Sequence, residues 1–141
     1  MKQTKPQAKQ LLFVYGTLMR VASGTLGRDE RERLARESSN LRPAILSGAA
    51  LYDLGRYPGL RDSDHRDDLV HGEALELLDP ERTFIWLDEY EGVTPPETSE
   101  YVRAKREILL AGGERLTAWV YMLRADAPSH QRIPGGGWPA V

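Results

Sequence analysis

The first hydrophobic run of the chain covers residues 11–15 and contains no polar interruption. A run of two leucines, phenylalanine, valine and tyrosine predicts a strand that is buried on both faces. Gly16 and Thr17 follow this run directly. Glycine allows a close approach of the backbone to another group, and the amides of such a turn can bind an anion. The segment is therefore a candidate binding loop, with a plain strand-to-loop turn as the alternative.

Two segments have the pattern of helices. Residues 28–39 combine high charge with helix-forming residues and few apolar anchors, which predicts an exposed flanking helix. A second helix is predicted over residues 80–92. Asp79 is its N-cap candidate, Pro80 occupies the first helical position, and Gly92 is placed to end it.

The remaining hydrophobic positions predict strands. The extended segments are 44–55, broken at Gly48, then 69–78, and a hairpin of 101–110 and 115–123 joined by Ala111, Gly112 and Gly113. Residues 56–68 have the pattern of a turn-rich acidic loop, and residues 131–141 that of a loop. Strands separated partly by helices and partly by a hairpin predict an α+β domain with a mixed sheet that can curl into a small barrel.

Length and composition limit the classes of function. With 141 residues the chain fits one domain, which we expect over residues 11–141 after a flexible N-terminal segment, 1–10. The net charge of −2 supplies no overall positive field, so we expect no nucleic-acid partner and no membrane partner. The absence of cysteine excludes disulfides and thiol nucleophiles. The polar start and the shortness of the first apolar run predict a cytoplasmic protein.

The end of the second predicted helix carries the best candidate for an acid or base. In a regular helix Phe84, Leu87, Asp88 and Glu91 share one face. Glu91 would then lie beside apolar groups, where desolvation raises the pKa of its carboxyl and makes it a better base near neutral pH. Alternatively, the helix frays before Gly92 and Glu91 is a solvated surface acid. The pattern alone leaves both interpretations open.

Other candidates carry weaker signals. Residues 57–60, YPGL, are a second candidate binding turn, with a plain turn as the favoured alternative, because Pro58-Gly59 is a good turn sequence and most such turns only reverse the chain. Tyr101, Trp119 and Tyr121 alternate along predicted strands and are core residues or the wall of a pocket.

No metal or cofactor is predicted. The three histidines, at 65, 71 and 130, lack the pairing of a zinc site. The acidic residues from Asp62 to Asp68 lack the ligand and the glycine that a calcium loop needs at its centre, where Arg66 and Asp67 stand. The chain also has no phosphate loop, dinucleotide fingerprint or nucleophile elbow.

The order of several short motifs resembles one family. The sequence is similar to the gamma-glutamylcyclotransferase-like proteins, including the AIG2-like and gamma-glutamylamine cyclotransferase branch. The matching pieces run from Leu11 to Trp138 and are FVYGTL, LYDLGRYPGL, VHGEALEL, LDEYEG, YVRAKREI, AWVYM and RIPGGGW. The family's late motif usually has an acidic residue where this chain has Gly136-Gly137-Trp138.

The resemblance implies a fold, a site and a reaction. The fold is a small mixed β-barrel with flanking helices, and the YGTL-type loop forms the mouth of its cavity. The implied catalytic residue is Glu91, in the D-x-x-E-G motif, and no metal is involved. The substrate-binding set is Tyr15, Gly16, Thr17 and Leu18 of the loop, with Pro58, Gly59 and Tyr101.

The implied reaction cyclises a γ-glutamyl amine or γ-glutamyl amino acid to 5-oxoproline and releases the free amine. The partner is therefore a small γ-glutamyl compound. A non-catalytic domain of the same fold that binds a small ligand is the alternative. The sequence does not fix the leaving amine or the oligomeric state.

Overall fold

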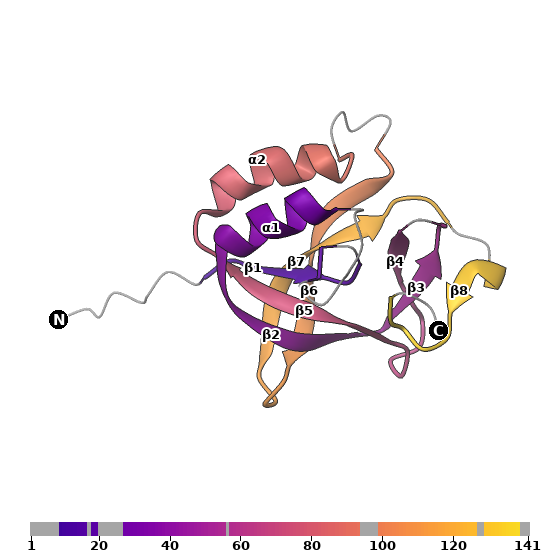
Figure 1. Cartoon of the computed structure of the whole chain (residues 1–141). Coiled ribbons are helices and arrows are strands. Elements are labelled where there is room, and N and C mark those ends of the chain that lie inside the picture. The colour runs from indigo at the N-terminus through magenta and orange to yellow at the C-terminus, as the bar shows by residue number, and fades with distance from the viewer. Residues whose placement is uncertain are drawn as a thin grey trace.

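A closed barrel of five strands forms the centre of the molecule (Figure 1). The computed structural model describes residues 9–16, 18–19, 27–55, 57–93, 99–126 and 129–138. The barrel strands follow the order β1-β5-β2-β6-β7. Their bounds are β1 Leu11–Val14, β2 Ser38–Ser47, β5 Leu69–Leu77, β6 Tyr101–Leu110 and β7 Arg115–Leu123. β1 pairs antiparallel with β5 and parallel with β7, so the sheet is mixed and closed.

A three-stranded sheet lies at one end of the barrel, in the order β4-β3-β8 (Figure 1). Its strands are β3 Ala49–Asp53, β4 Pro58–Asp62 and β8 Arg132–Ile133, and a 3-10 turn at Ser129–Gln131 precedes β8. β2 passes into β3 through Gly48, whose φ of 72° provides the predicted break.

The sheet corrects two predictions. The segment expected to be only a loop contains β4, which pairs with β3 and buries Leu60 in the core. Pro58 opens that strand, a position where its missing N–H is tolerated, so Pro58 and Gly59 are strand residues and not a turn. The C-terminal segment, expected to be a loop, contributes β8 to the other edge of β3.

Two helices, α1 Arg28–Arg36 and α2 Pro80–Tyr90, lie side by side on the same side of the barrel (Figure 1). Glu37 links them, because it follows α1 directly and accepts hydrogen bonds from Thr83 Oγ1 (2.7 Å) and Trp86 Nε1 (3.0 Å) of α2. Helix α1 ends three residues before the predicted end, at residue 39, since Ser38 and Ser39 already pair with β5. Among the described residues, none of the helices combines the length and the apolar character needed to cross a membrane.

β1 is buried on both faces, as its unbroken hydrophobic run predicts. Phe13 and Tyr15 belong to the cluster that fills the barrel, whereas Leu12 and Val14 belong to the cluster beneath the helices. Gly72 of β5 allows β1 to approach closely, since a Cβ at that position would lie 2.3 Å from the Val14 carbonyl oxygen. The predicted α+β fold with a mixed barrel and flanking helices is confirmed.

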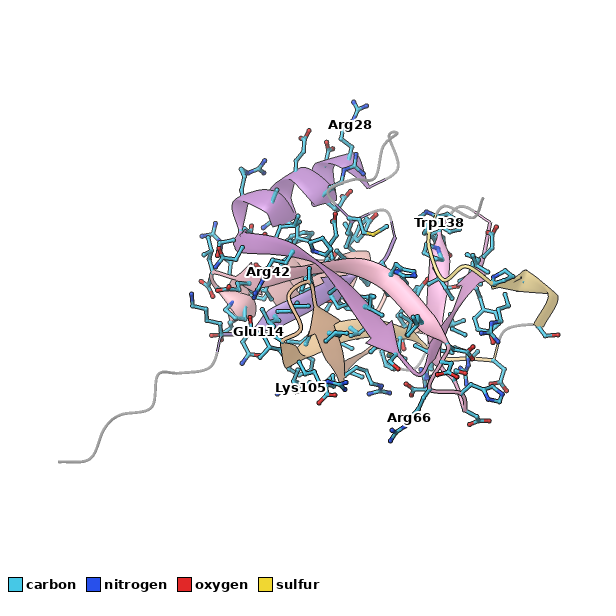
Figure 2. The ribbon with its side chains drawn as sticks, turned by 90° about the horizontal axis from the view of Figure 1, so that it is seen from below. Arg28, Arg42, Arg66, Lys105, Glu114 and Trp138 are labelled. Atoms are coloured by element: carbon cyan, nitrogen blue, oxygen red, sulfur yellow. The ribbon has the colours of Figure 1, made fainter. Side chains whose placement is uncertain are left out.

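Arg42 and Trp138 lie toward opposite ends of the molecule (Figure 2). Figure 2 shows Arg42 and Glu114 together at one end, where Arg42 Nη1 lies 3.2 Å from Glu114 Oε1. Trp138 lies toward the opposite end, beside the three-stranded sheet (Figure 2). It packs against both hydrophobic clusters and so ties the C-terminal segment to the core.

Candidate active site

The C-terminal end of α2 places Glu91 in a fixed position. Gly92 has a φ of 75°, and the N–H of Val93 donates to the Asp88 carbonyl (2.9 Å), which together make a Schellman motif. The N–H of Glu91 donates to the Leu87 carbonyl at 2.9 Å. The helix is therefore intact up to Glu91, and the interpretation in which it frays earlier is wrong.

The start of α2 is also determined locally. The side chain of Asp79 accepts a hydrogen bond from the Arg82 N–H (3.2 Å), and Pro80 occupies the first helical position. Both features agree with the predicted N-terminus, so the sequence fixes both ends of the helix that carries Glu91.

Asp88 connects this helix end to the barrel. Tyr121 Oη of β7 donates to Asp88 Oδ1 at 2.6 Å, and Arg103 of β6 donates to both carboxylate oxygens at 2.9 and 3.2 Å. The guanidinium of Arg103 also stacks over Phe84 at 3.9 Å and Trp119 at 4.5 Å. Asp88, one helical turn before Glu91, is thus held by two strands.

A cavity of about 410 Å³ opens beside the end of α2. Its wall is formed by the end of β1 and the following turn, the start of β4, the end of α2, the start of β6 and β7. Among the described residues, the lining contains no lysine, arginine or histidine. The lining residues are Phe13, Val14, Tyr15, Gly16, Leu18, Tyr57, Pro58, Tyr90, Glu91, Gly92, Glu100, Tyr101 and Tyr121.

The carboxyl of Glu91 has an unusual environment in this cavity. Burial, together with smaller contributions from the charges of Asp88 and Glu100, raises its pKa from 4.5 to about 7. A carboxyl with this pKa is populated in both protonation states near neutral pH. It can therefore take up and return a proton there, as a general acid and base must.

The turn after β1 forms the part of the wall next to β4. Met19 N–H donates to the Gly16 carbonyl at 3.0 Å and closes the turn. A Cβ on Gly16 would lie 2.9 Å from Cγ and Cδ of Pro58, so the close packing of this turn on β4 requires glycine. Leu18 is buried and also lines the cavity. Thr17, predicted with them, lies outside the described residues.

Three tyrosines of the wall, Tyr15, Tyr101 and Tyr121, use their hydroxyls to bind other groups of the protein. Tyr15 Oη donates to the Tyr121 carbonyl and accepts from the Leu60 N–H. Tyr101 Oη donates to the Pro58 carbonyl at 2.8 Å. Burial raises the pKa of the hydroxyls of Tyr15, Tyr101 and Tyr121 well above the ordinary value, so these hydroxyls stay neutral.

The structure brings most of the predicted site residues together. Tyr15, Gly16, Leu18, Pro58, Glu91 and Tyr101 all line one cavity. Gly59 does not line it, and a Cβ at that position would meet the side chains of Leu54 (3.0 Å) and Leu123 (3.1 Å), which are not lining residues either. Of the three alternating aromatics, Tyr101 and Tyr121 are pocket wall, whereas Trp119 is not a lining residue and packs edge-to-face against Phe84.

Sequence reasoning missed Tyr90 and Glu100 of the lining, and it included Tyr57 only as the first residue of a possible binding turn. Tyr57 Oη donates to Glu100 Oε1 at 2.9 Å, although 43 positions separate the two residues. No local pattern distinguishes Glu100 from the other acids of the chain. Only the pairing of β4 and β6 with the rest of the fold brings these side chains to one place.

Comparisons with known proteins agree with this arrangement. The model of the family described as "Gamma-glutamyl cyclotransferase, AIG2-like" matches residues 12–140. A protein of Vibrio cholerae serotype O1, named "Putative gamma-glutamylcyclotransferase", is 35% identical over 130 residues, which are 92% of this chain and 96% of that protein.

Solved structures share the fold. An AIG2-like protein from Mus musculus has a TM-score of 0.64 and 21% identity, with 86% of this chain and 82% of that chain covered. YkqA from Bacillus subtilis has a TM-score of 0.65 and 23% identity, with 93% of this chain covered. This chain spans only 40% of the length of YkqA.

Proposed function

Because the chain belongs to the AIG2-like gamma-glutamyl cyclotransferase family, we propose that it cyclises a γ-glutamyl amine or γ-glutamyl amino acid to 5-oxoproline and releases the free amine. The observation that carries the proposal is the Glu91 carboxyl, which faces the cavity with a pKa of about 7. A purely structural carboxylate in a protein is usually paired or solvated. Glu91 is partly buried, and none of the described lining residues is a cation that would neutralise it.

The reaction needs little beyond orientation and proton transfer. The α-amino nitrogen of the substrate attacks its own γ-carbonyl carbon, a five-membered ring closes, and the bond from that carbon to the leaving nitrogen breaks. One proton leaves the α-ammonium and one reaches the departing amine, so no water is consumed. Because nucleophile and electrophile belong to one molecule, binding the substrate in the conformation that brings them together lowers the activation barrier by up to about 11 kcal/mol.

Glu91 is proposed to move these protons. The α-ammonium of the substrate has a pKa of roughly 8, close enough to that of Glu91 for efficient transfer in either direction. The ionised carboxylate accepts the proton from the ammonium, and the resulting acid donates it to the leaving nitrogen. This chemistry requires no metal ion.

The turn after β1 is proposed to hold the γ-glutamyl group. The resemblance assigns Tyr15, Gly16, Thr17 and Leu18 to substrate binding, and backbone amides in such a turn suit the substrate carboxylate or the oxyanion that forms at the γ-carbonyl. The rings of Pro58 and Tyr101 then form the apolar wall beside the substrate chain. Gly59 supports this wall through its packing and does not contact the substrate.

The test is the release of 5-oxoproline from a panel of γ-glutamyl amino acids and γ-glutamyl amines. The proposal predicts that 5-oxoproline and free amine appear in equal amounts, and that EDTA does not change the rate. If a γ-glutamyl compound instead stabilises the protein against heat and is recovered intact, the domain binds its ligand without turnover. That outcome would replace the cyclotransferase with the binding-domain alternative.

A further inference from the structure

The cavity has a buried side and a solvent-facing rim. Phe13, Tyr15 and Gly16 are buried, and they form the side next to the turn after β1. Tyr57 and Tyr90 are 37% and 38% exposed and belong to the rim. Glu100 is also exposed and belongs to the lining, so a carboxylate stands where the cavity meets solvent.

Glu100 is held in place at this rim. Its Oε1 accepts a hydrogen bond from Tyr57 Oη (2.9 Å), and its carbonyl accepts one from the Arg124 N–H (2.8 Å). The ring of Tyr57 leans on that of Tyr101, with 6.4 Å between the centroids. The guanidinium of Arg124 donates to Ser99 Oγ at 3.1 Å, and Arg124 is not part of the lining.

The charges of the lining favour one orientation of a γ-glutamyl substrate. The α-carboxylate of the substrate would be repelled by Glu100 at the rim, whereas the amides of the turn after β1 attract it on the buried side. The γ-glutamyl group therefore lies on the buried side with Glu91 beside the scissile bond. The leaving amine then extends past Tyr57 and Tyr90 toward Glu100.

This orientation places the far end of the leaving group beside a carboxylate and two half-exposed aromatic rings. Both features favour an alkylammonium group, the rings through cation–π attraction. The carboxylate of Glu100 would repel a second carboxylate on the leaving group, and none of the described lining residues is a cation that could bind it. We propose that Glu100, oriented by Tyr57, is a specificity-determining residue that selects γ-glutamyl compounds whose leaving amine carries a second positive charge, such as an aliphatic diamine or polyamine. This inference rests on the proposed cyclotransferase activity.

Three γ-glutamyl compounds of similar length test the inference. The leaving amines are 1,4-diaminobutane, pentylamine and 4-aminobutyrate, whose far ends are cationic, neutral and anionic. Because the reacting amide is the same in all three, differences in kcat/KM report on recognition of the far end. For the wild type we expect the cationic compound to exceed the neutral one by about fivefold, and the anionic compound to be slowest. The preference should shrink at high salt.

Glu100→Gln is the decisive variant, because it keeps the size of the side chain and removes its charge. It should bring the three compounds to nearly equal kcat/KM. The compounds are compared with one another within each protein, because loss of the Glu100 charge also lowers the pKa of Glu91 and changes the rate with all three alike. Tyr57→Phe should weaken the preference in part, since Glu100 loses the hydrogen bond that orients it. Glu89→Gln is the matched control, because it removes an exposed carboxylate of α2 that does not line the cavity, and it should leave the preference unchanged.

The experiment distinguishes failure of the proposed activity from failure of the proposed role of Glu100. If the wild type releases 5-oxoproline from none of the three compounds or of the broader panel, the proposed function is overturned. If the wild type turns over all three compounds at equal kcat/KM, or if Glu100→Gln keeps the wild-type order, the activity stands and the role of Glu100 is overturned.

Discussion

At the level of single side chains, Glu91 couples the chemistry of the cavity to the stability of the fold. Its pKa rises from 4.5 in the unfolded chain to about 7, mainly because of burial. The folded state therefore binds a proton more tightly than the unfolded state does. The contribution of Glu91 to the free energy of unfolding is therefore fully present below about pH 4.5 and is lost as the pH rises through about 7.

Replacement of Glu91 by glutamine should remove this loss. At about pH 8 we expect Glu91→Gln to be more stable than the wild type by at most about 3 kcal/mol, and at about pH 4.5 to be equal to it. Urea unfolding at the two pH values measures the difference. Glu89→Gln, at an exposed site on the same helix, should show no such pH dependence. A difference between Glu91→Gln and the wild type that does not grow with pH would contradict the raised pKa.

The sequence identified Glu91 because its signal is local. The spacing from Phe84 and Leu87, with Gly92 directly after it, made Glu91 a candidate at an apolar helix end, and the family resemblance selected it over the solvated-acid alternative. Glu100 has no such signal, since its position in the cavity depends on Tyr57 from a distant part of the chain. Residues that act through long-range neighbours are those that sequence reasoning missed.

At the level of elements, the Schellman motif that ends α2 holds Glu91 in place. Gly92 has a φ of 75°, where a residue with a Cβ is strained, and no atom lies within 4 Å of a Cβ built there. Gly92→Ala should therefore lower the free energy of unfolding by about 1 kcal/mol through the backbone alone. It should also lower kcat, because the end of the helix shifts.

Two variants control this experiment. Gly137→Ala adds a methyl group in open space without a positive φ, and we expect it to leave stability and kcat unchanged. Gly92→Asn should recover part of the stability, because asparagine tolerates the left-handed region better than alanine does. Thermal unfolding and initial rates measure both effects. An alanine variant of Gly92 with unchanged stability and kcat would show that the motif does not position Glu91.

Elements with local signals were predicted well, and those with conflicting signals were not. Asp79, Pro80 and Gly92 predicted both ends of α2, and Gly48 predicted the break between β2 and β3. β4 was missed because Pro58-Gly59 has the composition of a turn, although pairing with β3 makes it a strand. Helix propensity likewise led to a predicted first helix that included Ser38 and Ser39. These two residues pair with β5 and are strand residues.

At the level of the whole molecule, the C-terminal segment closes the fold over β5 and β3. The Gly136 carbonyl accepts from the His71 N–H at 2.8 Å, and Ile133 pairs with Leu51 of β3. Gly136 has a φ of 67°, and a Cβ there would lie 1.9 Å from the Leu69 carbonyl oxygen. This position therefore accepts no side chain without displacement of the segment.

Gly136→Ala should lower the free energy of unfolding by more than about 2 kcal/mol, because strain and a backbone clash act together. Gly135→Ala, one residue earlier, meets no atom within 4 Å and should lie within about 0.5 kcal/mol of the wild type. Chemical denaturation of the pair gives the comparison. Equal stability of the two variants would mean that the C-terminal segment does not contribute to the fold.

The closure of the barrel lies beyond what local patterns can predict. The parallel contact of β1 with β7 joins Leu12 to Trp119, more than a hundred positions apart. Alternation and turn residues predicted the strands but not their order around the barrel. The order of elements allowed a mixed sheet that can curl into a small barrel, and the resemblance to a known family implied the barrel itself. The family match over residues 12–140 supports that resemblance.

The first measurement is kcat/KM for 5-oxoproline release by the wild type, Glu91→Gln and Glu89→Gln across the neutral pH range. If Glu91 is the acid and base, Glu91→Gln loses at least about 100-fold, while Glu89→Gln matches the wild type. The wild-type rate should also rise as the pH passes about 7, where the Glu91 carboxyl ionises. A folded Glu91→Gln protein with the wild-type rate and pH profile would contradict the assignment of Glu91.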